Sequence, residues 1–309
     1  MKVALLVGID AYPRAPLSGC IGDVNSMHEV LSRNDDGSPN FSCFRLVSSE
    51  QQVTRPLLRE NLEKLFAFQG EVALLFFAGH GYLSGLGGYL VTQDTTRYDE
   101  GISMTDVLAL ANRSHCREVI IMLDCCHSGA FGLLPIIAGE QAVLREGLAV
   151  LCASRATEAA VESNGAGRFT SLACEGLSGG AASLTGDVTL ASLYSFVQCN
   201  MGVWEQRPLF KANLSRLAVL RRCDPRLQVS ILQMLPHYFD GPHTVVTASL
   251  SNAVLRDVPA ENARSAHFRA FRREALIKTL DGAAFESNNP VALTALGRYY
   301  WQLAKQGIL

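Results

Sequence analysis

Residues 72–81 read VALLFFAGHG and residues 119–129 read VIIMLDCCHSG, and these two stretches decide the fold. Each begins with an uninterrupted apolar run, Val72–Phe77 in the first and Val119–Leu123 in the second. Runs of this length without polar alternation are typical of strands buried on both faces, as in a parallel sheet. Each run ends in polar residues, at the edge where an open α/β sheet binds its ligands.

Further strands and helices are predicted on both sides of these two runs. Other short apolar runs favour strands at Val3–Val7, Phe44–Val47 and Leu148–Cys152, with a shorter candidate at Gly88–Val91. Apolar residues at helical spacing, together with start signals, favour helices between them. These helices are Val24–Leu31 with Asp23 placed to cap it, one opened by Thr54-Arg55-Pro56, Ser103–Ala111, Phe169–Leu177 and Thr189–Val197. The alternation predicts βαβ units in an α/β fold with a mostly parallel central sheet.

The character of the sequence changes near Arg221–Pro225, which we interpret as a connection. Beyond it, helical patterns cover Arg264–Leu280 and Val291–Gln306, and the first of these carries several arginines. Residues from about 225 onward form either a small, mainly helical appendage or helices that complete the packing of the main sheet. The arginines either dock a partner or line the wet face of an amphipathic helix.

Composition excludes several classes of protein. The 309 residues are 48% hydrophobic and 18% charged, which is ordinary for a globular protein, and the net charge of −2 gives no field that favours nucleic acid or an anionic membrane. The nine cysteines are odd in number and irregularly spaced, which argues against a disulfide framework and for a reducing compartment. No apolar stretch is long enough to span a bilayer. We therefore predict a cytoplasmic protein, with no required metal or other cofactor.

A histidine and a thiol group follow the two deciding strands. His80 comes after the first strand and Cys126 after the second, so both are expected at the same edge of the sheet. A neighbouring imidazolium lowers the pKa of a thiol and produces a thiolate nucleophile, and the same ring can protonate a leaving amine. The glycines on either side of His80 allow the backbone to approach a substrate. This pair predicts nucleophilic catalysis by cysteine.

Several motifs together resemble the caspase-fold cysteine peptidases, most closely the metacaspases. They are the opening Lys2–Asp10, the segment Leu17-Ser18-Gly19-Cys20-Ile21-Gly22-Asp23-Val24, the histidine motif Phe77-Ala78-Gly79-His80-Gly81, the nucleophile motif Asp124-Cys125-Cys126-His127-Ser128-Gly129, and Ala153-Ser154 with Gly167-Arg168-Phe169-Thr170. The resemblance covers roughly residues 1–220. It implies a three-layer α/β/α caspase-like fold in residues 1–222, with a large-subunit-like part (1–130), a linker (130–147) and a small-subunit-like part (148–222). Residues 223–309 are then the mainly helical C-terminal region.

The resemblance implies roles for particular residues. Cys126 is the nucleophile because it lies two residues after the motif's Asp, and Cys125 fills the variable position as a small buried hydrophobe. Strand alternation agrees, since Asp124 and Cys125 should point to opposite faces. His80 is favoured as the base over the sequence neighbour His127. The backbone N–H groups of Gly81 and Cys126 are the implied oxyanion donors.

The resemblance also implies a substrate class. Asp23 and Asp124, with Cys20 nearby, correspond to the acidic specificity pocket of metacaspases, which accepts arginine or lysine before the scissile bond. The alternative role for Asp23 is that of a helix N-cap. Metacaspases often carry serine where this chain has Ala78, so the chain departs from the family pattern at a position that borders the specificity pocket. Asp94, Asp99 and Glu100 do not match the family's calcium cluster and are interpreted as a solvated loop.

The resemblance suggests regulation as well. Caspase-fold enzymes are often zymogens held inactive by the segment between the two halves, which here is Ala130–Gly147 with Arg145 as a candidate processing site. Protein substrates are expected, and an activating protease or regulatory protein is a candidate partner, in a stress, cell-death or antiviral defence pathway. Two alternatives stay open: a catalytically silent caspase-like adaptor or scaffold, and a different cysteine hydrolase on an open α/β sheet.

Overall fold

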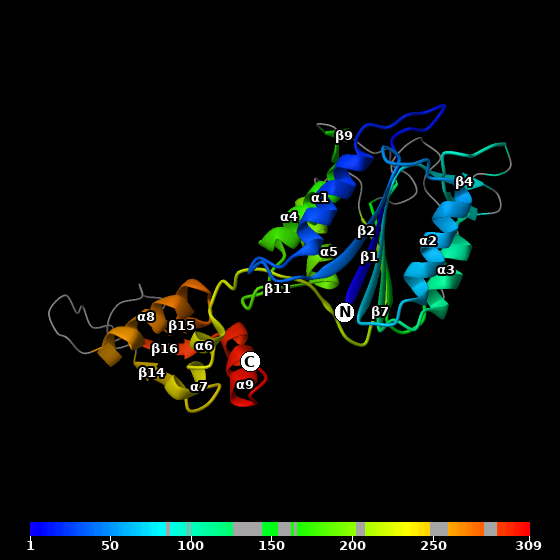
Figure 1. Cartoon of the computed structure of the whole chain (residues 1–309). Helices are drawn as coiled ribbons and strands as arrows, with labels where there is room; N and C mark the ends of the chain where they lie inside the picture. The colour runs from blue at the N-terminus through cyan, green and yellow to red at the C-terminus, as the bar shows by residue number, and fades with distance from the viewer. Residues whose placement is uncertain are drawn as a thin grey trace. The chain divides into compact units, whose positions relative to one another are not determined.

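A six-stranded sheet forms the centre of the first part of the chain in the computed structural model (Figure 1). Five strands run parallel, and β12 at one edge is antiparallel to its neighbour β8. The order across the sheet is β12-β8-β7-β3-β1-β2. The strands are β1 (Lys2–Gly8), β2 (Phe41–Val47), β3 (Val72–Ala78), β7 (Glu118–Asp124), β8 (Leu148–Cys152) and β12 (Leu209–Asn213). This mixed, mostly parallel sheet confirms the predicted fold class.

The structure describes residues 1–84, 87–97, 99, 101–125, 144–153, 162–163, 166–201, 208–247, 259–280 and 289–309. These residues form two compact units. The first comprises residues 1–182 and 187–223, and the second comprises residues 183–186 and 224–309. Each unit has a hydrophobic core of its own, so each is described separately.

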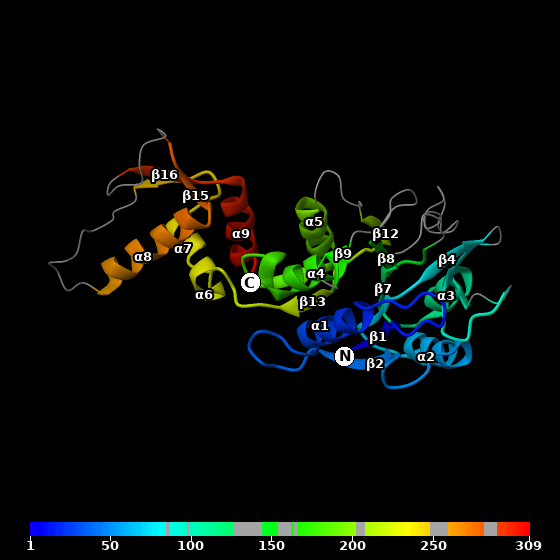
Figure 2. The ribbon, with the colours of Figure 1, turned by 90° about the horizontal axis from the view of Figure 1, so that it is seen from above.

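Helices cover both faces of the sheet in the first unit, which gives three layers (Figures 1 and 2). All seven residues of β3 and of β7 are buried, which is why both read as continuous apolar runs. In β7, Val119 and Ile121 pack on one face with α2 and α3, while Ile120 and Met122 pack on the other with α1, α4 and α5. The helices are α1 (Cys20–Ser32), α2 (Arg55–Ala67), α3 (Met104–Arg113), α4 (Arg168–Glu175), continued by the π-helical turn Gly176–Gly180, and α5 (Leu190–Asn200).

Capping side chains start three of these helices where the sequence predicted. Thr54 accepts from the Leu57 N–H at the start of α2, and Ser103 accepts from the Thr105 N–H at the start of α3. A capping box of Thr189 and Ser192 opens α5. These hydrogen bonds satisfy N–H groups that have no partner inside the helix.

The start of α1 differs from the prediction. The helix begins at Cys20, and Asp23 lies in its first turn, so the N-cap role considered for Asp23 is wrong. The carboxylate of Asp10 satisfies the helix start instead, because it accepts hydrogen bonds from the N–H groups of Cys20 (2.9 Å) and Ile21 (3.2 Å). An acid outside the helix therefore replaces the local cap.

Smaller sheets account for the strands that the sequence missed or misplaced. The candidate strand Gly88–Val91 is β5 (Gly87–Leu90), which pairs with β4 (Gly81–Ser84) and β6 (Ile102–Ser103) rather than with the main sheet. The sixth strand of the main sheet is β12, whose partly exposed residues gave no apolar run. Two further pairs are β9 (Glu162–Ser163) with β10 (Ala166–Gly167), and β11 (Asp187–Thr189) with β13 (Val219–Arg222).

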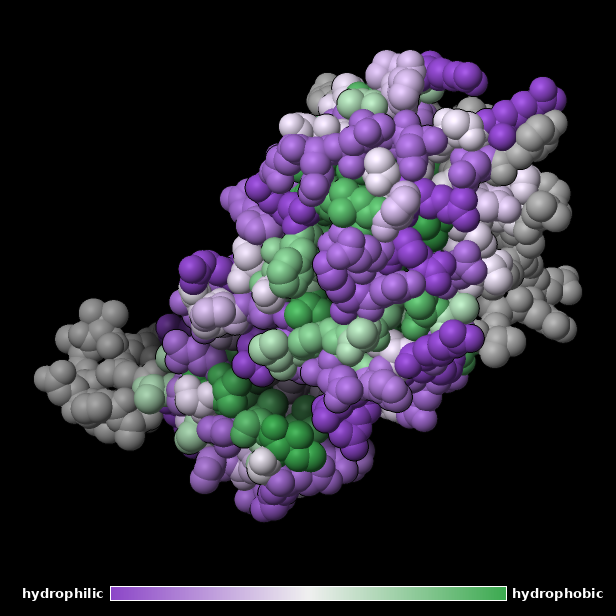
Figure 3. Space-filling model, turned by 45° about the vertical axis from the view of Figure 1, so that its right-hand side comes forward, coloured by the Kyte–Doolittle hydropathy of each residue, from purple (hydrophilic) through white to green (hydrophobic). Residues whose placement is uncertain are grey.

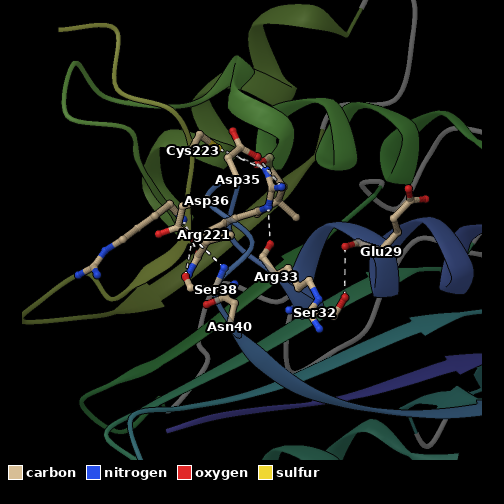
Figure 4. Close-up of polar contacts among 12 residues, drawn as sticks. Glu29, Ser32, Arg33, Asp35, Asp36, Ser38, Asn40, Arg221 and Cys223 are labelled. Carbon is tan, nitrogen blue, oxygen red and sulfur yellow. Dashed lines mark hydrogen bonds and ion pairs between the residues drawn. The ribbon is translucent and has the colours of Figure 1, made fainter. Parts of the chain in front are cut away.

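Strand β13 also corrects the interpretation of Arg221–Pro225 as a connection, since Arg221 and Arg222 belong to the strand. Arg221 is held among partners from other elements (Figure 4). It forms an ion pair with Asp35 (2.6 Å) and donates to the carbonyls of Arg33 and Leu177, each at 2.9 Å. These contacts tie the last strand of the first unit to the connection between α1 and β2 and to the start of the π-helical turn.

The second unit combines helices with an antiparallel sheet. Its helices are α6 (Val229–Leu232), α7 (Leu235–Tyr238), α8 (Pro259–Arg273) and α9 (Ala295–Lys305), and its strands are β14 (Val245–Thr247), β15 (Ile277–Thr279) and β16 (Pro290–Leu293), in the order β14-β16-β15. The predicted helices Arg264–Leu280 and Val291–Gln306 are therefore wrong in part, because residues 277–279 and 290–293 are strands. Ile277, Val291 and Leu293 alternate into the core on these strands, and short buried strands are easily mistaken for helix ends.

Polar and apolar residues are interspersed on the face of the molecule in Figure 3. Large apolar side chains are exposed in both units, for example Phe44 in the first and Tyr299 in the second. Over the residues that the structure describes, no helix combines the length and the apolar character needed to cross a membrane.

Candidate functional site

The carboxyl ends of β3 and β7 form the base of the site. Ala78 and Asp124 are the last residues of these strands and are paired in register. His80 lies two residues beyond Ala78, and Cys126 lies two residues beyond Asp124 in the sequence. The chain thus leaves both strands at one point of the sheet edge. Cys126 itself, His127 and Ser154 lie outside the described residues.

The imidazole of His80 is oriented by the loop that follows β1. Its Nε2 atom lies 2.7 Å from the carbonyl oxygen of Ala15. Because a carbonyl oxygen can only accept, Nε2 carries the proton in this hydrogen bond. The neutral ring therefore has Nδ1 as its basic nitrogen, and this is the atom that can take a proton from a thiol.

Tyr12 from the same loop holds the backbone of His80. Its hydroxyl accepts from the His80 N–H (3.0 Å) and donates to the Val91 carbonyl (3.2 Å), and its ring centroid lies 4.5 Å from that of the imidazole. Burial raises the pKa of the Tyr12 phenol, so it remains neutral. A Cβ atom at Gly79 would lie 2.5 Å from the Tyr12 hydroxyl oxygen. The glycine before His80 is therefore required by the position of Tyr12.

The Asp124 carboxylate is buried on the face of the sheet that α1 and α4 cover. Its Oδ2 atom accepts a hydrogen bond of 2.6 Å from the Thr170 hydroxyl on α4. Cys125 is half-buried and packs against the cluster on the opposite face, so the predicted packing is found but the burial is incomplete. Burial raises the pKa of the Cys125 thiol, and the charges of Cys152 and Asp124 add to the shift. Cys125 is thus poorly suited to act as a thiolate.

Acidic groups gather around the thiol of Cys20 at the start of α1. Burial raises the pKa of the Cys20 thiol, and the negative charges of Asp10, Asp23 and Asp124 raise it further. Asp23 is itself buried. The three candidate pocket residues Cys20, Asp23 and Asp124 therefore share one electrostatic environment, to which Asp10 also belongs.

Gly8 allows α1 to approach this region. It is paired in register with Ala78, which is in turn paired with Asp124. A Cβ atom at Gly8 would lie 2.7 Å from the carbonyl oxygen of Cys20. The missing side chain at Gly8 and the small one at Ala78 keep the start of α1 close to Asp124.

The other predicted site residues are placed as follows. Gly81 opens β4 and is paired with Leu90, directly after His80. Arg145 donates from its guanidinium to the carbonyls of Ala111, Cys116 and Glu146, and its N–H donates to Asn112 Oδ1.

The acidic residues that were compared with a calcium cluster have protein partners. Asp94 and Asp99 are exposed and both contact Arg55, through its N–H and its guanidinium respectively, while Glu100 lies outside the described residues. Among the residues described, no group of three or more His, Cys, Asp or Glu is arranged to hold a metal ion.

Sequence reasoning missed Asp10, Tyr12, Ala15 and Thr170 as parts of this site. Ala15 acts through its backbone carbonyl, which no residue type reveals. Asp10 and Tyr12 directly follow an apolar strand, and this polar strand end was the available signal. Thr170 was quoted in a motif without a role, because its contact with Asp124 joins residues 46 positions apart.

Comparisons with known proteins agree with this architecture. The family model described as "Caspase domain" matches residues 1–219. The crystal structure of protein GSU0716 from Geobacter sulfurreducens is similar in fold, with a TM-score of 0.52 at 15% identity, over 73% of this chain and 98% of that one. No curated protein matches the sequence. The family model spans more than two thirds of the chain, over the unit that holds the sheet and His80, and the chain therefore belongs to the caspase-domain family of cysteine peptidases.

Proposed function

We propose that this protein is a cysteine endopeptidase that cleaves proteins after arginine or lysine, with His80 and Cys126 as its catalytic dyad. The observation that carries the dyad is the register of Ala78 with Asp124, because each catalytic residue lies two positions beyond one of these partners. The hydrogen bond from His80 Nε2 to Ala15 supports the same assignment, since it leaves Nδ1 as the base.

The proposed reaction has two stages. His80 Nδ1 takes the proton of the Cys126 thiol, and the thiolate attacks the carbonyl carbon of the scissile bond. The N–H groups of Gly81 and Cys126 stabilise the resulting oxyanion. The imidazolium then gives its proton to the leaving amine, which yields a thioester. In the second stage His80 takes a proton from water and the hydroxide attacks the thioester carbonyl. The C–S bond then breaks, the new carboxyl end of the substrate leaves, and the imidazolium returns its proton to the Cys126 sulfur.

Specificity for a basic residue is supported by the acids around Cys20. The negative charges of Asp10, Asp23 and Asp124 all raise the pKa of this thiol, which places three acids close to it. Asp23 and Asp124 are buried acids at this point of the sheet, and the family resemblance implies that they line the pocket, so they are the proposed partners of a guanidinium or ammonium group. A pocket for aspartate would instead need cations in this position.

A panel of fluorogenic peptides with Arg, Lys or Asp before the scissile bond tests this proposal. We expect cleavage after Arg and Lys, and no cleavage by Cys126→Ala or His80→Ala. Cleavage only after Asp would overturn the pocket assignment. If no peptide is cleaved and an arginine-based chloromethyl ketone does not label Cys126, the protein is better explained as a silent adaptor or scaffold.

The proposal includes regulation by cleavage or by a partner protein. It also includes a role in stress, cell death or defence, and this role is supported by the family resemblance alone. A cut after Arg145 has a structural obstacle, because four hydrogen bonds hold this residue. We therefore expect this cut to be slow in the folded chain. Mass spectrometry of samples taken as activity appears measures this cleavage, with Cys126→Ala as the control. Rapid cleavage after Arg145 before activity appears would contradict the expectation of a slow cut.

A further inference from the structure

We propose that Thr170 determines specificity by fixing the Asp124 carboxylate in the orientation that binds a guanidinium group. This inference rests on the proposed function, since it concerns how the same pocket distinguishes arginine from lysine. Thr170 would act through Asp124 and is therefore a positioning residue.

The contact between the two residues is short and buried. The Thr170 hydroxyl lies 2.6 Å from Asp124 Oδ2, and a carboxylate can only accept, so the hydroxyl is the donor. Thr170 is 1% exposed and Asp124 is 5% exposed. A hydrogen bond to a charged acceptor is about twice as strong as one between neutral groups, and burial protects it from competition by water.

The residue paired with Asp124 on strand β3 has no side-chain donor. Ala78 is paired in register with Asp124 on β3, and its methyl group has no hydrogen-bonding atom. The hydroxyl support therefore comes from the first turn of α4, across the layer that covers this face of the sheet.

A fixed carboxylate plane matters more for arginine than for lysine. A guanidinium group binds a carboxylate through two parallel hydrogen bonds, which require a defined orientation of both planes. An ammonium group is a compact charge that accommodates a rotated carboxylate. Loss of the Thr170 hydroxyl should therefore weaken recognition of arginine more than recognition of lysine.

The test compares Thr170→Val with Thr170→Ser on matched Arg and Lys peptides. Valine keeps the branched shape without the hydroxyl, and serine keeps the hydroxyl. For Thr170→Val we expect KM for the Arg peptide to rise roughly tenfold, KM for the Lys peptide to rise less, and kcat to change less than twofold. Thr170→Ser should restore the preference for arginine. Alkylation of Cys126 by iodoacetamide should stay unchanged in both variants, because this reagent does not use the pocket.

Thr92→Val is a matched control for stability. Thr92 is also 1% exposed and also donates to an aspartate, Asp94, at 2.7 Å, but it is not part of the pocket. We expect it to lower Tm without changing the ratio of Arg to Lys cleavage. If Thr170→Val changes the two KM values equally, or lowers kcat and alkylation together, Thr170 only supports the fold and the inference is wrong.

The same experiment separates this inference from the proposed function. If the wild type cleaves neither peptide, the proposed function fails and the role of Thr170 fails with it. If the wild type cleaves both and Thr170→Val keeps the wild-type ratio, only the inference about Thr170 fails. A variant that does not fold is recognised by its far-UV circular dichroism, and the serine variant then decides, because it must keep the wild-type ratio.

Discussion

His80 is held by atoms that come from distant parts of the chain. The Tyr12 hydroxyl accepts its N–H, the Ala15 carbonyl accepts its Nε2 proton, and the Val91 N–H donates to its carbonyl oxygen. The imidazole therefore presents Nδ1 without depending on a neighbouring side chain in the sequence. Groups that only hold a catalytic residue in place can affect turnover as strongly as direct contacts.

The Tyr12 hydroxyl should affect turnover more than substrate binding. Tyr12→Phe keeps the ring beside the imidazole but leaves the His80 N–H without its acceptor. We expect kcat to fall roughly tenfold with KM within a factor of two, because a displacement of the proposed base, His80, slows proton transfer. Steady-state kinetics on an Arg peptide and the pH profile of Cys126 alkylation check this. A change in Tm alone, with both readouts unchanged, would contradict it.

At the scale of elements, the start of α1 packs closely against the end of β1 and the residues that follow it. Gly8 lies under the carbonyl of Cys20, and the Asp10 carboxylate accepts from the first N–H groups of α1. These contacts fix the helix that carries Cys20 and Asp23 against the strand end that carries Asp124. The distance across the proposed pocket therefore depends on the small size of residue 8.

Gly8→Ala should displace the start of α1, because its Cβ atom would lie 2.7 Å from backbone that cannot rotate away. We expect a lower Tm and a KM for Arg peptides raised at least several-fold. Gly22→Ala is the matched control on the same helix, since nothing lies within 4 Å of its Cβ position. It should raise stability by up to about 1 kcal/mol, as alanine replaces glycine in a helix. Equal effects of both substitutions would argue against a tight contact at Gly8.

Glu118 at the start of β7 should make stability depend on pH. Its carboxylate is buried and accepts from the Ala218 N–H (2.8 Å), and burial raises its pKa above the ordinary value of 4.5. The folded state therefore holds this proton more firmly than the unfolded state, and the free energy of unfolding falls as pH rises through the folded pKa. Glu118→Gln keeps a carbonyl acceptor without the charge.

Urea unfolding of wild type and Glu118→Gln between pH 4 and pH 8 tests this. We expect the variant to gain stability relative to wild type as the pH rises above 4.5, and to lose that advantage at the acidic end of the range. A difference between the two proteins that stays constant across this range would show that the burial of the charge is compensated in the folded state.

At the scale of the whole molecule, the chain passes from the first unit to the second more than once. Residues 183–186 belong to the second unit although residues 187–223 return to the first. Leu184 is buried in the second core, and the Leu227 N–H donates to its carbonyl. The domain boundary expected near residue 222 from the sequence does not account for residues 183–186, which belong to the second unit.

The two cores should respond separately to cavities. Leu184→Ala removes buried volume from the second core and Leu31→Ala removes it from the first, each at a cost of about 2–5 kcal/mol. Hydrogen exchange followed by mass spectrometry should show faster exchange in α8, α9 and β16 for the first variant, and in α1 and β1 for the second. Faster exchange in both units for either variant would show that they unfold together.

The sequence by itself determined the parallel strands, most helices of the first unit, and the identity of His80, Asp124 and Cys20 as residues to examine. Continuous apolar runs, capping residues and polar strand ends are local signals, and they survive without knowledge of the fold. The sequence did not predict strands β12, β15 and β16, because their short or half-exposed runs carry little periodic signal.

Only the tertiary structure decided which groups support the site. The carbonyl of Ala15, the hydroxyls of Tyr12 and Thr170 and the carboxylate of Asp10 reach their partners through register and helix packing, and three of these contacts span more than 40 residues. A residue's local sequence fixes its chemistry and its place on an element. Which partner the residue contacts depends on how the helices and strands pack. The local sequence pattern does not show which residues, far apart in the chain, are brought together by this packing.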